Sequence, residues 1–148
     1  MRPPFAFAPW MRIAVGELGI REVPGGGSNP RIIEYLQTVH AYGGDETPWC
    51  SGFVNWVMQK ASYPATWKAH AQSWLAYGER MDRPRYGAIV VLWRDSPDSW
   101  MGHVGFYIDD ADRRSIKILG GNQNNRVSIA AYPKVRVLGY RWPILTST

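Results

Sequence analysis

The residue with the clearest chemical potential is Cys50, the single cysteine among 148 residues, which lies in the segment ETPWCSGFVNWV. A cysteine thiolate is a strong nucleophile, but a lone cysteine can also be a small buried apolar residue or a metal ligand. A zinc site is disfavoured because no second ligand stands at the short spacing of a zinc motif. A structural cysteine and a nucleophile both stay open on this segment alone.

The residues around Cys50 predict a helix over 48–61. Thr47 is a good N-cap, and Pro48 is favoured at a first helical position because its missing N–H would be unpaired there. Cys50 would then lie in the first turn, where free N–H groups and the helix dipole lower a thiol pKa. Its helical face is apolar and comprises Phe53, Val54, Val57 and Ala61. We therefore expect Cys50 to point inward, toward a sheet.

A cysteine nucleophile needs a base within hydrogen-bond reach, and the chain has three histidines. His40 lies in a polar loop and His70 near a helix start, where solvent-facing or capping roles are expected. His103 differs because it begins the alternating segment HVGFYI, which is typical of a strand. A structural role for His103 stays open, but it is the candidate base.

A third polar residue follows from the hairpin that joins two predicted strands. If the turn is centred between Asp112 and Arg113, Asn122 lies opposite His103 across the strand pair. Such a side chain can hold an imidazole in its useful tautomer. Asn122 also lies in GGNQNN, which is typical of a turn, and a one-residue slip would move it to the other face.

The rest of the chain predicts one α+β domain over residues 1–148. Helices are expected at 9–22, 31–38, 48–61 and 70–77, and strands at 87–93, 103–108, 115–121, 126–130 and 135–142. Helices first and strands second favour helices packed on one face of a five-stranded antiparallel sheet. No linker is long enough to separate two domains.

Charge and hydropathy exclude several classes of protein. The formal net charge is +5 and the pI about 9.6, but the basic residues are scattered, and no nucleic-acid motif is present. No run approaches 18 apolar residues, so stable membrane insertion is not expected. The opening MRPPFAFAPWMR is a poor signal peptide. We expect synthesis in the cytoplasm and action elsewhere only after release or delivery.

Three segments together resemble the NlpC and CHAP superfamily of cysteine peptidases and amidases: TPWCSGFVNWV, GHVGFYI and ILGGNQ. The resemblance spans roughly residues 9 to 143 and is closest to compact phage and prophage members. It implies a papain-like core that hydrolyses amide bonds of peptidoglycan without metal or cofactor. Cys50 matches the nucleophile, His103 the general base and Asn122 the residue that orients the histidine.

The resemblance also departs from the family pattern, at Gly120 and at Gly87-Ala88 where many relatives have Gly-Asp, and it suggests a substrate site. Many CHAP members have a Glu where this chain has Gly120, so that role is absent or filled by Asn122 or Gln123. Residues expected to bind the stem peptide flank the nucleophile or follow Asn122: Asp45, Glu46, Trp49, Ser51 and Gln123. Asp45 and Glu46 are equally well explained as charges ahead of a helix start.

Two main functional hypotheses follow. The first is a peptidoglycan hydrolase, either an endopeptidase or an N-acetylmuramoyl-L-alanine amidase, which works through a thioester on Cys50. It would be a phage lysin or a delivered antibacterial protein that acts in the periplasm or cell wall. An inhibitor or a delivery protein is a further expected partner. The alternative is a non-catalytic module that binds the cell envelope. A nucleic-acid binder is a third hypothesis without a supporting motif, and the scissile bond stays open.

Overall fold

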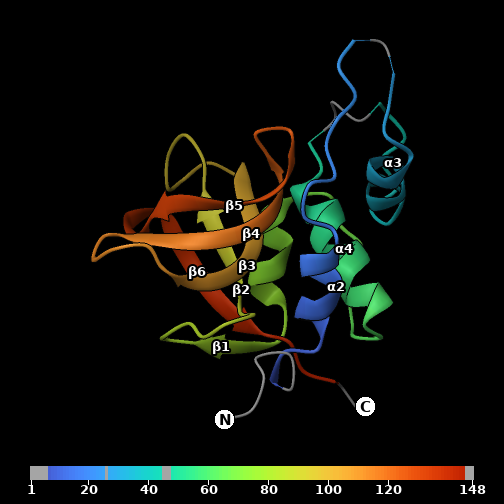
Figure 1. The fold of residues 1–148 in the computed structure, drawn as a ribbon. Helices are drawn as coiled ribbons and strands as arrows, with labels where there is room; N and C mark the ends of the chain where they lie inside the picture. The colour runs from blue at the N-terminus through green and yellow to red at the C-terminus, as the bar shows by residue number, and fades with distance from the viewer. Residues whose placement is uncertain (1–6, 26, 45–47, 146–148) are drawn as a thin grey trace.

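Helices occupy the N-terminal half of the chain and strands the C-terminal half, as the computed structural model shows for residues 7–25, 27–44 and 48–145 (Figure 1). The helices are α2 (Trp10–Gly16), α3 (Pro30–Gln37), α4 (Cys50–Lys60) and the short 3-10 helix η1 (Ala71–Ala76). The strands are β1 (Glu79–Met81), β2 (Ile89–Trp93), β3 (Gly102–Asp110), β4 (Ser115–Gln123), β5 (Arg126–Pro133) and β6 (Val137–Trp142), with the 3-10 turn η2 (Lys134–Arg136) before β6.

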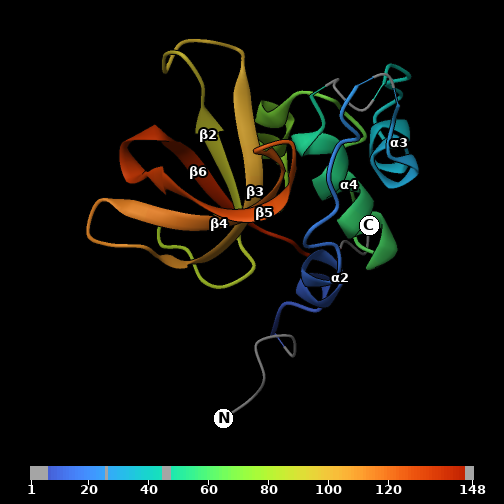
Figure 2. The same cartoon turned by 45° about the horizontal axis from the view of Figure 1, so that its top comes forward.

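The strands form one antiparallel sheet in the order β1-β6-β2-β3-β4-β5. Both cartoon views place the helices together beside this curved sheet, so the predicted α+β class is confirmed (Figures 1 and 2). The prediction of five strands was one short, because the three-residue β1 carries no alternating pattern and is defined by its pairing with β6.

Helix α4 is the centre of the structure, since it packs against α2, α3 and strands β3 and β4. Every residue from Cys50 to Met58 is buried. The prediction of a single inward stripe was therefore incomplete, because α3 covers the face of α4 that is turned away from the sheet. A helix buried on both faces needs small or well-paired residues on its second face, which here include Ser51, Gly52 and Asn55.

Helix α2 is shorter than the predicted 9–22 segment because the chain turns at Gly19, which adopts φ +97°. Beyond that turn, Gly19 N–H donates to the Val127 carbonyl at 3.0 Å, and Val127 N–H donates to the Ile20 carbonyl at 2.7 Å. The segment thus pairs with the start of β5 rather than continuing as a helix. Tertiary pairing overrides the local helical pattern.

The start of α4 reaches the sheet at Gly121 of β4. A Cβ atom at this position would lie 2.6 Å from Cζ3 of Trp49, so only glycine lets the helix start approach β4 closely. Trp49 is fully buried, stacks on Tyr35 and donates from Nε1 to a carboxylate oxygen of Glu22 at 3.0 Å. These contacts fix the end of α4 that carries Cys50.

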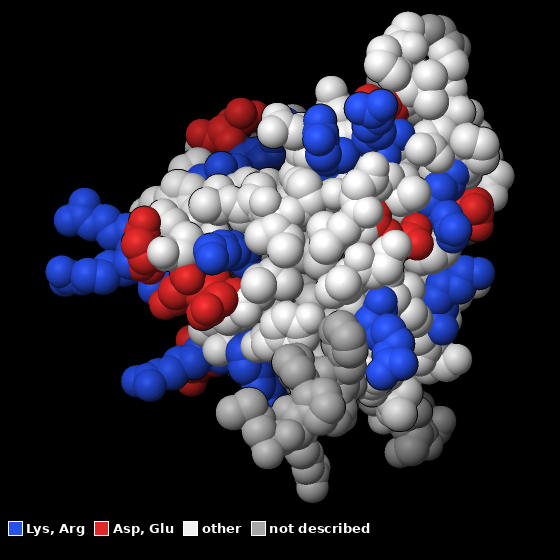
Figure 3. Space-filling model, viewed as in Figure 1, with Lys and Arg blue, Asp and Glu red and all other residues white. Residues whose placement is uncertain are grey.

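Basic side chains are distributed over the face in Figure 3 with acidic ones among them, and they form no continuous stripe there. This agrees with the scattered charge expected from the sequence. Within the described residues, no helix has the length and apolar character needed to span a bilayer.

Close packing of α3 on α4 makes a sharp prediction for two glycines. A Cβ at Gly52 would lie 2.7 Å from the Tyr35 carbonyl oxygen, whereas a Cβ at Gly16 in α2 meets no atom within 4 Å. Gly52→Ala should therefore lower the free energy of unfolding by about 2 kcal/mol. Gly16→Ala should be neutral or stabilising by up to about 1 kcal/mol. Urea unfolding of both variants checks this, and an unchanged Gly52→Ala midpoint would contradict the packing.

Candidate active site

Cys50 is the first residue of α4, not a residue within a helix that begins at Pro48. Trp49 occupies the N-cap and makes no side-chain cap hydrogen bond, while the predicted cap Thr47 lies outside the described residues. The backbone N–H groups of Cys50, Ser51 and Val104 lie where they can donate to the sulfur. Val104 directly follows His103 in β3. The start of α4, which carries the candidate nucleophile, therefore lies against the part of β3 that carries the candidate base.

Burial, not the helix dipole, decides the charge of Cys50. Its exposed fraction is 8%. Loss of hydration raises the pKa of the thiol, and the three backbone N–H groups with the charge of Arg94 oppose that rise without cancelling it. The expectation of a lowered pKa was therefore wrong, because it counted the helix end without the desolvation. Cys50 rests as a thiol and needs a base to become a nucleophile.

His103 is held in one tautomer by Gln123. The Nε2 atom of His103 lies 2.8 Å from Oε1 of Gln123. The amide nitrogen of Gln123 donates to the carbonyls of Ser128 at 2.9 Å and Ile118 at 3.2 Å, which leaves its oxygen to face the imidazole. An amide oxygen only accepts, so Nε2 must carry the proton. The lone pair of His103 is consequently on Nδ1, where it can take a proton.

The side chain that hydrogen-bonds His103 is Gln123 rather than Asn122, so the predicted orienting residue is off by one position. The predicted hairpin register holds where Phe106 pairs with Leu119 and Tyr107 with Ile118, but it shifts by one residue nearer the turn, where Asp109 pairs with Lys117. Beyond these pairs β4 has an irregularity between Gly120 and Gln123, and Asn122 adopts φ +61°. This bulge breaks the alternation of side chains and turns Gln123 to the face of His103.

Gly120 makes room for the pair that Gln123 forms. A Cβ at Gly120 would lie 2.5 Å from Oε1 of Gln123 and 3.4 Å from Nε2 of His103. Any larger residue there would displace the amide from the imidazole. Gln123, which was expected to bind substrate or to fill the role of the missing Glu, occupies the space beside His103.

Three further residues surround His103, and none of them was predicted from the sequence. The Tyr132 ring stacks on the imidazole with centroids 5.2 Å apart, and its hydroxyl lies 3.3 Å from Nε2. The Arg136 guanidinium lies over the Tyr132 ring at 5.6 Å and donates from Nε to the Trp93 carbonyl at 3.0 Å. Arg94 adds a second nearby positive charge. Tyr132 lies on the part of β5 beyond the predicted strand 126–130, so no local pattern pointed to it.

Burial also keeps His103 neutral. Desolvation lowers the pKa of His103 to about 4, the hydrogen bond that His103 donates to Gln123 opposes this, and the charges of Arg94 and Arg136 add to the lowering. Near neutral pH the site therefore holds a thiol beside a neutral imidazole. Within the described ranges, no three Cys, His, Asp or Glu side chains cluster closely enough to hold a metal ion. The arrangement suits nucleophilic attack with proton transfer to His103.

Two of the predicted substrate-binding residues are structural. Trp49 is fully buried in the core. Ser51 is also fully buried, where its hydroxyl donates to the Lys68 carbonyl at 2.7 Å and accepts from Nε1 of Trp74 at 3.0 Å. Both face inward because α4 is covered on both sides. Asp45 and Glu46 lie outside the described residues.

The lowered pKa of His103 predicts how stability depends on pH. The unfolded chain binds a proton below pH 6.5, while the folded chain resists protonation until about pH 4. The free energy of unfolding should therefore fall as pH decreases through this window, by about 3 kcal/mol from this group. Denaturant unfolding of the wild type and of His103→Gln, measured from pH 7 down to 4, checks this because that range spans the two pKa values of His103. Equal pH slopes for the two proteins would contradict a buried neutral imidazole.

Comparisons with known proteins place the chain in a family of domains. The model of the CHAP domain matches residues 42–122. Among solved structures, a protein from Staphylococcus aureus described as similar to lipoprotein, NLP/P60 family, is 14% identical with a TM-score of 0.42, and the match covers 84% of this chain and 44% of that one. The chain thus spans less than half of that protein's length. A comparison with curated proteins finds no match. Because the domain match takes in more than half of the sequence, including Cys50 and His103, the chain belongs to the CHAP domain family.

Proposed function

We propose that this protein hydrolyses an amide bond of bacterial peptidoglycan, with Cys50 as nucleophile and His103 as general base. CHAP domains are peptidoglycan hydrolase-type domains, which supports the substrate class. The observation that supports catalysis most is the fixed tautomer of His103, whose Nε2 proton is held by Gln123 while Nδ1 keeps its lone pair. A module that only binds the cell envelope has no need for this arrangement.

The proposed reaction begins from neutral partners. Nδ1 of His103 takes the thiol proton as the sulfur of Cys50 attacks the peptide carbonyl, which gives a tetrahedral intermediate. The C–N bond then breaks, the proton passes from His103 to the leaving amine, and an acyl thioester remains on Cys50. Water, deprotonated by the same imidazole, cleaves the thioester and restores the thiol. Proton transfer must accompany attack because a separated thiolate and imidazolium are disfavoured by burial.

The start of α4 is suited to stabilise the oxyanion. Trp49 at the N-cap makes no side-chain cap hydrogen bond, and the N–H groups of Cys50 and Ser51 lie beside the sulfur. Donors placed in advance where negative charge develops lower the barrier of acyl transfer. We assign the backbone N–H of Cys50 and its neighbour at the helix end to this role.

The surroundings of His103 fit a substrate that carries carboxylates. A hollow of about 450 Å³ lies along β5, and its lining includes Gln123, Arg126, Ser128 and Tyr132. Arg94 and Arg136 add positive charge close to Cys50 and His103. Stem peptides of peptidoglycan carry free carboxylates, and guanidinium groups bind carboxylates with good geometry. The hollow along β5 is therefore the proposed site for the stem peptide.

Digestion of purified sacculi tests the proposed function directly. Wild-type protein should release fragments that mass spectrometry detects, and Cys50→Ala should release none because no other group can form the thioester. Free peptides would identify an amidase, and shortened stem peptides an endopeptidase. Either product fits action in the cell wall, as a phage lysin or a delivered antibacterial protein. Equal release by a folded wild type and Cys50→Ala would favour the envelope-binding alternative.

The geometry also separates the roles of Gln123 and Asn122. Gln123→Leu removes the acceptor of the Nε2 proton, so kcat should fall by about 100-fold with little change in KM, within the usual contribution of acid–base catalysis. Asn122→Gly keeps the left-handed backbone of the bulge and should retain near wild-type kcat, because the hydrogen bond to His103 comes from Gln123 and not from Asn122. Steady-state kinetics on solubilised peptidoglycan fragments checks both variants. A larger loss of kcat in Asn122→Gly than in Gln123→Leu would mean that Asn122 orients the histidine.

A further inference from the structure

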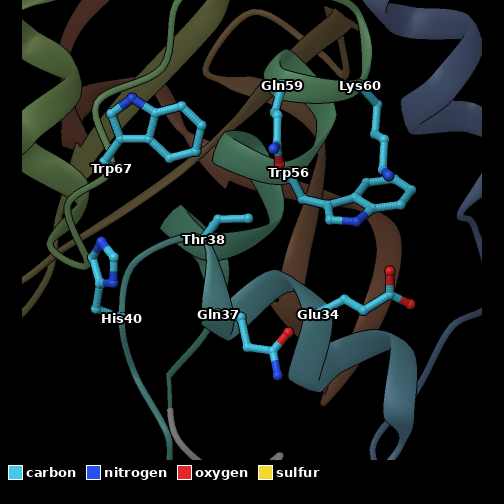
Figure 4. A pocket seen from close by; sticks show the side chains of 8 residues that line it. All are labelled: Glu34, Gln37, Thr38, His40, Trp56, Gln59, Lys60 and Trp67. Carbon is cyan, nitrogen blue, oxygen red and sulfur yellow. The ribbon is translucent and has the colours of Figure 1, made fainter.

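A second hollow lies on the opposite side of α4 from the sheet, between α3, α4 and the segment that follows α4 (Figure 4). Its volume is about 320 Å³, within the range of ligand pockets. Gln37 and His40 border it on the α3 side, and Gln59 and Trp56 border it on the α4 side. Trp67 borders it from the segment that follows α4. None of these residues takes part in the proposed reaction.

Trp67 is the unusual member of this group. It is a bulky residue with φ +60°, a conformation that such side chains rarely adopt. Its indole is nevertheless 46% exposed, and Figure 4 shows it directed toward Gln59 across the hollow. An exposed apolar ring adds little to the stability of the fold, and its disfavoured backbone conformation costs stability. Such a residue points to a function that needs the ring in this place.

A buried polar network holds Trp67 in this conformation. Its backbone N–H donates to Oδ1 of Asn55 at 2.7 Å, and Asn55 is fully buried in α4. The amide nitrogen of Asn55 donates to the Ser51 carbonyl at 2.9 Å, which fixes the orientation of the amide. The position of the indole is therefore set by the centre of the fold before any ligand arrives.

The groups that surround the hollow favour a neutral ligand. The charges at its border already have partners in the protein: Glu34 lies 3.8 Å from Arg31, and the Lys60 ammonium lies over the Trp56 ring at 5.5 Å. The exposed amides of Gln37 and Gln59 offer donors and acceptors without charge. A flat indole with amides beside it suits a ligand with an apolar face and a polar rim. A pyranose ring with hydroxyl and acetamido groups has this character.

We propose that the hollow bordered by Trp67 binds an N-acetylated sugar of the glycan strand. The choice of this sugar rests on the proposed function, because the same polymer would supply the stem peptide to Cys50. Trp67 stacks on the apolar face of the sugar, and Gln37 and Gln59 bind its acetamido and hydroxyl groups. The hollow is linked to the nucleophile through α4, since the Lys68 carbonyl next to Trp67 accepts from Ser51. Glycan binding here would hold the enzyme on its polymer between cleavage events.

Titration of full-length Cys50→Ala with tri-N-acetylglucosamine tests this site without hydrolysis. The Trp67 indole N–H and the Gln59 amide should show saturable NMR shifts. Trp67→Gly, which suits a left-handed backbone, should keep the fold by circular dichroism and weaken binding by about tenfold or more, the loss expected from one stacking contact. Gln59→Ala should also weaken binding. Trp100→Ala is the matched control, because Trp100 is 75% exposed in another loop and should bind as Cys50→Ala alone does.

Two results would overturn the proposal. One is the absence of a saturable shift at Trp67, including the case in which a stem peptide shifts it and the sugar does not. The other is unchanged affinity in both Trp67→Gly and Gln59→Ala. Failure of the proposed function looks different: sugar binding would persist while sacculi stay undigested. If only the hollow is wrong, sacculi are cleaved and the trisaccharide does not bind.

Discussion

Burial of a thiol at the start of α4 and of an imidazole on β3, next to Val104 whose N–H faces the sulfur, is the constraint on which the candidate site depends. Cys50 is 8% exposed and His103 is 7% exposed, and loss of hydration favours the neutral form of each. A neutral imidazole serves as base only if its proton sits on the nitrogen away from the thiol. The structure meets this need with Gln123, whose uncharged amide holds the Nε2 proton without adding a buried negative charge.

Much of the surrounding backbone positions the side-chain amide of Gln123. Gly120 leaves space for it, the left-handed Asn122 turns it toward His103, and Ser128 on β5 fixes its orientation. Gly121 meanwhile lets Trp49 and the start of α4 settle on the same strand. Three consecutive residues of β4 thus accommodate the imidazole partner and the helix that carries the thiol. Substitutions in this short segment should affect catalysis and folding together.

The parts of the site that depend on local patterns could be predicted from the sequence. The helix that carries Cys50, the strand at His103 and the pairing of that strand with the next are each encoded by neighbouring residues, and the α+β class follows from their order. Gln123 was missed as the partner of His103 because one bulge shifts the alternation, and alternation cannot show where a bulge lies. Trp49 and Ser51 were misassigned because the cover that α3 gives to α4 is a tertiary feature.

The pH dependence of Cys50 alkylation tests the central claim most directly. If the thiol and His103 are both neutral at rest, the rate with iodoacetamide should rise steadily with pH and show no plateau between the lowered pKa of His103, about 4, and the raised pKa of Cys50. A fast, pH-independent plateau across the neutral range, lost in His103→Gln, would show a preformed thiolate–imidazolium pair. That result would contradict the neutral pair and the account of how burial shapes this site.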